Sequence, residues 1–167
     1  MWKGRKAAFA AVGRISPNYI VQDGVIPRTT LPEVLREIAD LGRRYGLRVA
    51  NVFHAGDGNL HPLVLYDERD AGAYHKAEEL AAAILKTCVA HGGSLTGEHG
   101  VGVEKRPYMP VMFTAADMET HQMVRCAFNP ANLCNPDKVY PTPRLCGEVP
   151  GKYVPHPLEL AGVAERF

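Results

Sequence analysis

The sequence predicts an α+β fold in which an antiparallel sheet carries helices on one face. Three segments favour strands: 18–26, 47–54 and 59–66. One longer segment with a helical period precedes the second strand, and another follows the third. A further short apolar segment follows the second helix. The resulting order, strand, helix, strand, strand, helix, strand, is that of a split β-α-β unit. It predicts a ferredoxin-like, four-stranded antiparallel sheet, followed by a C-terminal helical segment.

The first half of the chain begins with a short helical candidate at residues 3–12, and 18–26 forms the first strand. Thr30 is suited to cap the next helix, because a proline and an acid follow in its first turn. That helix ends at Gly46. Its apolar residues recur on one face with a 3.6-residue period: Leu31, Val34, Leu35, Ile38 and Leu41.

The middle of the chain contains the hairpin strands 47–54 and 59–66, followed by the longest helix, 71–91. The Gly92-Gly93 pair ends this helix. The segment "SLTGEHG" then predicts a short fourth strand that runs into a loop.

The C-terminal part begins where Thr114, with Asp117 three residues later, opens a helix that runs to about Phe128. The residues beyond it are irregular and rich in proline, and the tail to Phe167 favours extended structure with a short helical stretch near 158–164. This part supplies the predicted C-terminal helical segment.

Composition restricts the possible functions. A chain of 167 residues with 46% hydrophobic and 22% charged residues can bury one core. The formal net charge of +1, without a basic stripe, argues against a nucleic-acid partner. The apolar runs are too short and too interrupted to cross a membrane, and no secretion signal is visible. We therefore expect a cytoplasmic protein.

The motif "HAGDGNLH" places His54 and His61 on either side of a cluster of turn residues. If Asp57-Gly58 forms the tip of a hairpin, His54 pairs directly with His61 on one face of the sheet. Two imidazoles held in this way can chelate one divalent cation. The alternative is an ordinary turn with cross-strand polar pairing.

The motif "TGEHGVG" offers Glu98 and His99 to complete such a site. As neighbours in an extended segment they would point in opposite directions, so one could bind metal while the other does something else. The surrounding glycines let the backbone approach a ligand closely. The alternative is again a loop with ordinary surface residues.

Three segments, "VANVFHAGDGNLHPLVLYD", "GGSLTGEHGVGVEK" and "FNPANLCNPDK", together resemble the C-terminal region of the FAD-linked 2-hydroxy-acid oxidases of the vanillyl-alcohol oxidase superfamily. Within that family, the segments resemble the FAD-binding D subunits of glycolate oxidases. "WKGRKAAFAAVGRISPNY", "QDGVIPRTTLPEVL" and "PLELAGVAERF" extend the resemblance to nearly the whole chain. Three motifs in the same order are more specific than any one alone.

The resemblance implies a cap domain that holds a 2-hydroxy acid over the flavin. In members that bind a divalent metal, the two histidines of "HxGDGNLH" and the glutamate of "GEHG" are ligands, which here are His54, His61 and Glu98. Zinc is our first choice of metal for this ligand set. The resemblance also implies that the histidine after the glutamate, here His99, is the base that accepts the hydroxyl proton.

Two further roles follow from the resemblance. The arginine of the "WxxR" stretch falls on Arg5 and would grip the substrate carboxylate, and the asparagine of the "NP" motif falls on Asn135, near the flavin. Leu63 stands where some relatives have a polar residue, which favours a small substrate such as glycolate or D-lactate. Asp137 replaces the usual glycine of "NPGK", a departure in the loop on the flavin side.

The implied reaction oxidises a small 2-hydroxy acid to the 2-oxo acid, with hydride transfer to FAD and onward electron transfer to partner subunits. Those subunits could hold the protein at the periphery of the inner membrane. The family's FAD domain should precede this region, and no GxGxxG motif is visible. We therefore expect residues 1–167 to be a single cap and C-terminal domain, with FAD bound mainly by a domain absent from this chain.

Three interpretations remain open. The chain is the substrate side of an oxidoreductase, or a non-catalytic module that binds a metal or a hydroxy acid, or a chain that docks onto a separate FAD-domain subunit. On the first interpretation, the isolated chain folds but binds no FAD and oxidises no hydroxy acid. It would also self-associate through the face that should meet the FAD domain.

Overall fold

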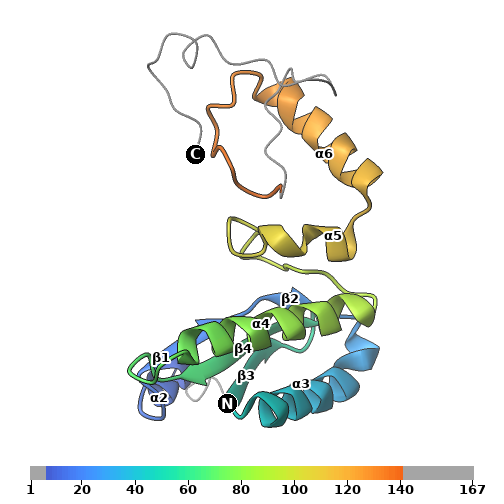
Figure 1. Cartoon of the computed structure of the whole chain (residues 1–167). Coiled ribbons are helices and arrows are strands. Elements are labelled where there is room, and N and C mark those ends of the chain that lie inside the picture. The colour runs from blue at the N-terminus through green and yellow to red at the C-terminus, as the bar shows by residue number, and fades with distance from the viewer. Residues whose placement is uncertain (1–6, 141–167) are drawn as a thin grey trace.

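The computed structural model describes residues 7–140, apart from the side chain of Phe9. Its centre is an antiparallel sheet with α3 and α4 packed on one face, which confirms the α+β class (Figure 1). The helices and strands, in chain order, are α2 (Ala8–Val12), β1 (Asn18–Val21), β2 (Gly24–Val25), α3 (Leu31–Tyr45), β3 (Arg48–His54), β4 (Asn59–Tyr66), α4 (Ala73–Ala90), α5 (Met109–Met112) and α6 (Ala115–Phe128). Short 3₁₀ turns at Arg28–Thr30 and Arg106–Tyr108 precede α3 and α5.

Strand β4 is the centre of the sheet, because β1, β2 and β3 all pair with it in antiparallel register. The predicted strand 18–26 is interrupted at Gln22 and Asp23, which separates β1 from β2. The predicted fourth strand is reduced to a single bridge between Val25 and Ser94. The ferredoxin-like arrangement requires this fourth strand, so it stays a prediction.

The start and the end of α3 differ in how well the sequence predicted them. Gly46 ends the helix as expected, with a left-handed φ of 61° and an N–H that donates to the carbonyl oxygen of Arg43. The predicted side-chain cap by Thr30 is wrong. Its hydroxyl donates instead to the carbonyl oxygen of Pro27, at 2.8 Å, within the preceding 3₁₀ turn.

The two faces of β4 are covered differently. Leu60 and Val64 belong to the main core, which they share with α3 and α4. Leu63 and Leu65 point to the other face, where they pack with Val12 of α2. Because side chains alternate along a strand, His61 shares the face of Leu63 and Leu65 and lies opposite α3 and α4.

The chain after α4 continues away from the sheet through α5 to α6 (Figure 1). Leu85, Leu95 and Met109 form a small buried cluster that anchors α5 to α4. Helix α6 begins with the predicted capping box, in which Thr114 and Asp117 bind each other's backbone N–H groups. Within residues 7–140, every helix is too short or too polar to serve as a membrane span.

Candidate metal centre

The two motif histidines lie on one face of the β3–β4 hairpin. His54 ends β3 opposite Asn59, and His61 lies in β4 opposite Val52. The predicted direct pairing of His54 with His61 is therefore wrong by two residues. A shift of two keeps both side chains on the same face, so the expected proximity still holds. Their ring centroids are 5.4 Å apart, with the ring planes at 81°.

Gly58 explains the register of the hairpin. The loop between the strands is four residues, 55–58, and the carbonyl oxygen of His54 accepts from the N–H groups of Asp57 and Gly58. Gly58 has a φ of 73°, and a Cβ there would lie 2.1 Å from the carbonyl oxygen of Ile26. The carbonyl oxygen of Gly58 also accepts from the N–H of Ile26 at 3.0 Å. The hairpin tip is thus fixed against the residue that follows β2.

Glu98 approaches both histidines from the loop after the Val25–Ser94 bridge. Its Oε1 lies 3.1 Å from Nε2 of His61 and 3.8 Å from Nε2 of His54. One ligand atom from each of these three side chains lies within 4.8 Å of the other two. The structure therefore brings together the three residues that the sequence indicated as metal ligands.

His99 also approaches His61, which the expected extended geometry did not predict. The two imidazoles stack with centroids 4.9 Å apart and planes 12° from parallel. Glu98 and His99 do not diverge in the expected way, because the segment is bent rather than extended. Both neighbours therefore face His61, with Glu98 at its Nε2 and His99 against its ring.

Asp23 is the residue that the sequence did not single out. It lies at the break between β1 and β2, and its side chain is completely buried. Its Oδ2 accepts four hydrogen bonds from the bent segment: from Thr96 Oγ1 and from the backbone N–H groups of Gly97, Glu98 and His99. The only sequence signal was a polar Gln-Asp pair inside an otherwise strand-like segment.

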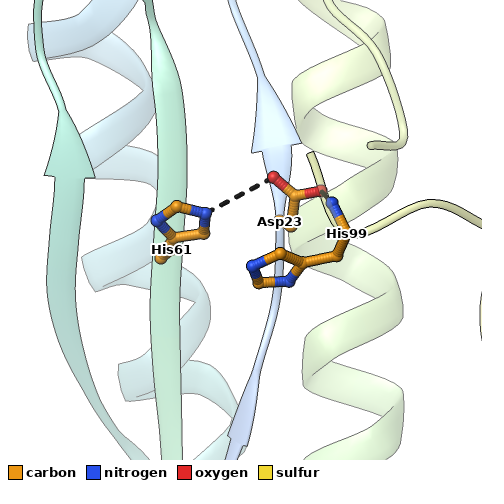
Figure 2. A group of neighbouring side chains, drawn as sticks. All are labelled: Asp23, His61 and His99. Atoms are coloured by element: carbon orange, nitrogen blue, oxygen red, sulfur yellow. Dashed lines mark hydrogen bonds and ion pairs between the residues drawn. The ribbon is translucent and has the colours of Figure 1, made fainter. Parts of the chain in front are cut away.

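Asp23, His61 and His99 are shown together in Figure 2, where the dashed line joins Asp23 to His61. Nε2 of His61 and Oδ1 of Asp23 lie 3.5 Å apart. Both atoms are buried, and neither has a hydrogen-bond partner within the described part of the chain. Nε2 of His61 lies close to Glu98, but this contact does not have the geometry of a hydrogen bond. Unsatisfied buried polar atoms are costly unless a further group satisfies them.

The electrostatics of these groups fit a divalent cation. Burial lowers the pKa of His61, and the nearby carboxylates only partly oppose this effect, so the imidazole is neutral and has a lone pair to offer. Burial alone would raise the pKa of Asp23, but the hydrogen bonds from His99, Thr96 and Gly97 outweigh it and lower that pKa well below its usual range. A neutral imidazole beside the ionised carboxylate of Asp23 is an environment that favours a bound cation such as zinc.

Two predicted site residues remain, Arg5 and Asn135. Arg5 is outside the described residues. Asn135 is exposed in the segment after α6, with a positive φ of 45°. Its carbonyl oxygen accepts from Arg125 of α6 at 3.1 Å, so the described contacts tie it to α6.

Comparisons with known proteins agree with the sequence motifs. Residues 1–139 match the family described as FAD linked oxidases, C-terminal domain. The glycolate oxidase subunit GlcD of Escherichia coli is 52% identical over 155 residues, which are 93% of this chain and 31% of that protein. GlcD of Bacillus subtilis is 33% identical over 138 residues, which are 83% of this chain and 29% of that protein.

A more distant relative is named for a different activity. The mitochondrial D-lactate dehydrogenase (cytochrome) of Arabidopsis thaliana is 28% identical over 148 residues, which are 87% of this chain and 26% of that protein. The chain thus spans about a third or less of the length of these relatives. Because the family match covers most of the chain, the protein belongs to the FAD-linked oxidases and carries their C-terminal domain.

Proposed function

We propose that this chain forms the substrate side of a FAD-dependent oxidoreductase that converts glycolate to its 2-oxo acid. The observation that carries the proposal is the convergence of His54 and Glu98 on the buried, unsatisfied Nε2 of His61, with the His99 imidazole stacked alongside. In this proposal the chain is a single cap and C-terminal domain. An FAD domain, from the same polypeptide or from a separate subunit, completes the active site.

His54, His61 and Glu98 are the residues that would hold a divalent cation. Two histidines and one carboxylate leave coordination positions open, as in catalytic rather than closed structural zinc sites, so zinc is our first choice. The bound cation would supply Lewis acidity to the substrate hydroxyl, and FAD would supply the two-electron acceptor. Glu98 is half exposed, which leaves the site accessible from solvent.

His99 is the proposed base. Its ring is exposed and is oriented by the stack against His61, which itself is fixed in β4. An imidazole accepts a proton readily near neutral pH, so it can take the hydroxyl proton as the C2 hydrogen leaves. Arg5 would orient the substrate carboxylate through paired hydrogen bonds, and Asn135 would lie near the flavin.

Glycolate is preferred over D-lactate as the substrate. The Escherichia coli relative named as a glycolate oxidase subunit is 52% identical to this chain, against 28% and 32% for two relatives named as D-lactate dehydrogenases. Since the glycolate oxidase relative is named as a subunit, we also propose partner subunits that accept the electrons. Such partners would bring a cytoplasmic protein to the surface of the inner membrane.

The test uses this chain joined to or assembled with its FAD domain, and measures how fast the bound flavin is reduced, under anaerobic conditions, after mixing with glycolate or D-lactate. We expect glycolate to reduce the flavin faster. His99→Gln should slow reduction by about 10²- to 10⁴-fold with unchanged flavin content, because it removes the base. His75→Gln is the matched control, since His75 is an exposed histidine on α4 that pairs with Glu78 and Glu79. Reduction at the normal rate in His99→Gln would contradict the assigned base, and no reduction by either acid would contradict the proposed activity.

A further inference from the structure

Asp23 organises the segment that carries Glu98 and His99. The distances from its Oδ2 to the four donors are 2.7 Å for Thr96 Oγ1, 2.8 Å for Gly97 N, 3.1 Å for Glu98 N and 2.9 Å for His99 N. Three consecutive backbone N–H groups therefore converge on one oxygen atom. Consecutive N–H groups point to alternate sides of an extended strand, so this convergence requires the bend that turns both side chains toward His61.

A carboxylate suits this position better than a neutral acceptor. Hydrogen bonds to an ionised acceptor are about twice as strong as neutral ones, and several donors share this oxygen. Lys105, which is also buried, provides the opposing charge: its Nζ lies 2.9 Å from the carbonyl oxygen of Asp23 and 3.4 Å from Oδ2. The charge of Asp23 is thus compensated on the side away from His61, and its position is fixed at both the backbone and the side chain.

The second carboxylate oxygen remains available to the metal site. All of the described donors to the side chain bind Oδ2, while Oδ1 is buried, unsatisfied and 3.5 Å from Nε2 of His61. Asp23 forms a possible ligand group with His61 and His99, but not with the set of His54, His61 and Glu98. Its oxygen therefore lies beside the proposed ligand set rather than within it.

We infer that Asp23 is a positioning residue of the metal centre: its Oδ2 holds Glu98 and His99 against His61, while its Oδ1 places a buried negative charge beside the cation. This inference rests on the proposed metal site. It gives the strand break at Gln22 and Asp23 a role, because the Asp23 side chain binds the bent segment from this break.

The first measurement is made on the full chain without metal. Asp23→Asn keeps the size of the side chain but loses the charge, and its amide N–H₂ must face either the four donors or Nε2 of His61. We expect hydrogen exchange of the Gly97, Glu98 and His99 amides to rise by about 10- to 100-fold, since each loses a charge-assisted hydrogen bond. Asp57→Asn, in the exposed hairpin tip, is the matched control and should leave these rates unchanged. Unchanged exchange in Asp23→Asn would overturn the positioning role.

The second measurement titrates zinc and cobalt(II) into the same proteins. Asp23→Asn should weaken zinc binding by about 10- to 100-fold, as loss of an outer partner of metal ligands typically does, and should change the visible spectrum of bound cobalt(II). Thr96→Val, which removes one donor and no charge, should have a smaller effect of the same sign. An unchanged affinity and spectrum would overturn the inference. If the cobalt(II) spectrum instead shows that the ion has lost one oxygen ligand completely, Asp23 is a direct ligand. That result would also overturn the inference.

The two measurements separate this inference from the proposed function. If the unmodified chain binds neither metal, the proposed metal centre fails, and the hydrogen-exchange comparison still decides whether Asp23 holds the segment. If Asp23→Asn does not fold, Thr96→Val carries both tests, because it leaves the buried carboxylate and its pairing with Lys105 in place. Normal exchange and normal zinc affinity in Thr96→Val would then count against the inference.

Discussion

Oδ1 of Asp23 and Nε2 of His61 face each other across 3.5 Å, and both are buried without a hydrogen-bond partner among the described residues. A cation bound by His61 would satisfy the lone pair of the imidazole and would attract the carboxylate. Asp23 itself is held by hydrogen bonds to its other oxygen, so the arrangement exists before any cation arrives. The site is therefore largely organised by the fold, and the cation is expected to add to its stability.

Zinc should raise the thermal stability of the full chain. A ligand that binds only the folded state contributes about 2.7 kcal/mol when its concentration is 100 times Kd. For a domain of this size that corresponds to a rise in Tm of about 5–10 °C. Differential scanning calorimetry with zinc, and again after chelation by EDTA, measures the shift. His61→Ala should remove it, and an equal shift in that variant would show that zinc binds elsewhere.

Gly97→Ala should weaken the metal site while leaving the sheet intact. A Cβ at this position would lie 2.8 Å from both Nδ2 of Asn59 and Cγ2 of Val25, so either these side chains or the segment carrying Glu98 must move. We expect about a tenfold or greater loss of zinc affinity, measured by calorimetry. Gly56→Ala is the matched control, because no atom lies within 4 Å of a Cβ there. Equal affinities in the two variants would contradict the described packing.

Gly24→Ala should destabilise the core through a single neighbour. The added Cβ would lie 2.7 Å from Sγ of Cys88, which is completely buried and cannot move into solvent. Overpacking of this kind costs about 1–3 kcal/mol in the free energy of unfolding, measured by urea denaturation. Adding Cys88→Ala should recover part of the loss, giving a favourable coupling between the two sites. Purely additive effects would mean that Cys88 is not the obstacle.

Asp117 should titrate below its ordinary value. Its pKa is lowered from 3.8, chiefly by the hydrogen bond from the Thr114 hydroxyl and then by that from the Thr114 N–H. The folded pKa is the lower one, so the stabilisation of α6 is present above 3.8 and is lost as the pH falls through the folded pKa. NMR titration of the Asp117 carboxyl measures this pKa. Thr114→Ala should bring it back toward 3.8, and a pKa at or above that value in the unmodified chain would contradict the capping box.

The elements that the sequence predicted well are those with strong local signals. Strand 59–66 was predicted with the bounds that β4 has, and the end of α3 follows from the left-handed conformation of Gly46. The capping box at Thr114 is likewise a local pattern. The predicted hairpin register was wrong because Gly58 is held by Ile26, the residue after β2, and local turn preferences do not contain this distant contact.

The site was predictable as a set of residue types but not as an arrangement. His54, His61 and Glu98 were indicated by their motifs, and the fold does bring them together. The approach of both Glu98 and His99 to His61 depends on Asp23, more than 70 residues away along the chain. An acid within a strand-like segment has no local feature that reveals such a role, so only the three-dimensional structure could identify it.

Calorimetric titration of zinc into the unmodified chain and four variants tests whether His54, His61 and Glu98 bind the cation. His54→Ala, His61→Ala and Glu98→Ala should each weaken zinc binding strongly, because each removes one of three protein ligands. His99→Ala should leave the affinity nearly unchanged, because its imidazole stacks on the ring of His61 and is not one of the three proposed ligands. Loss of binding in His99→Ala with normal binding in Glu98→Ala would reverse the roles of these neighbours, and normal binding in all four variants would contradict the metal centre itself.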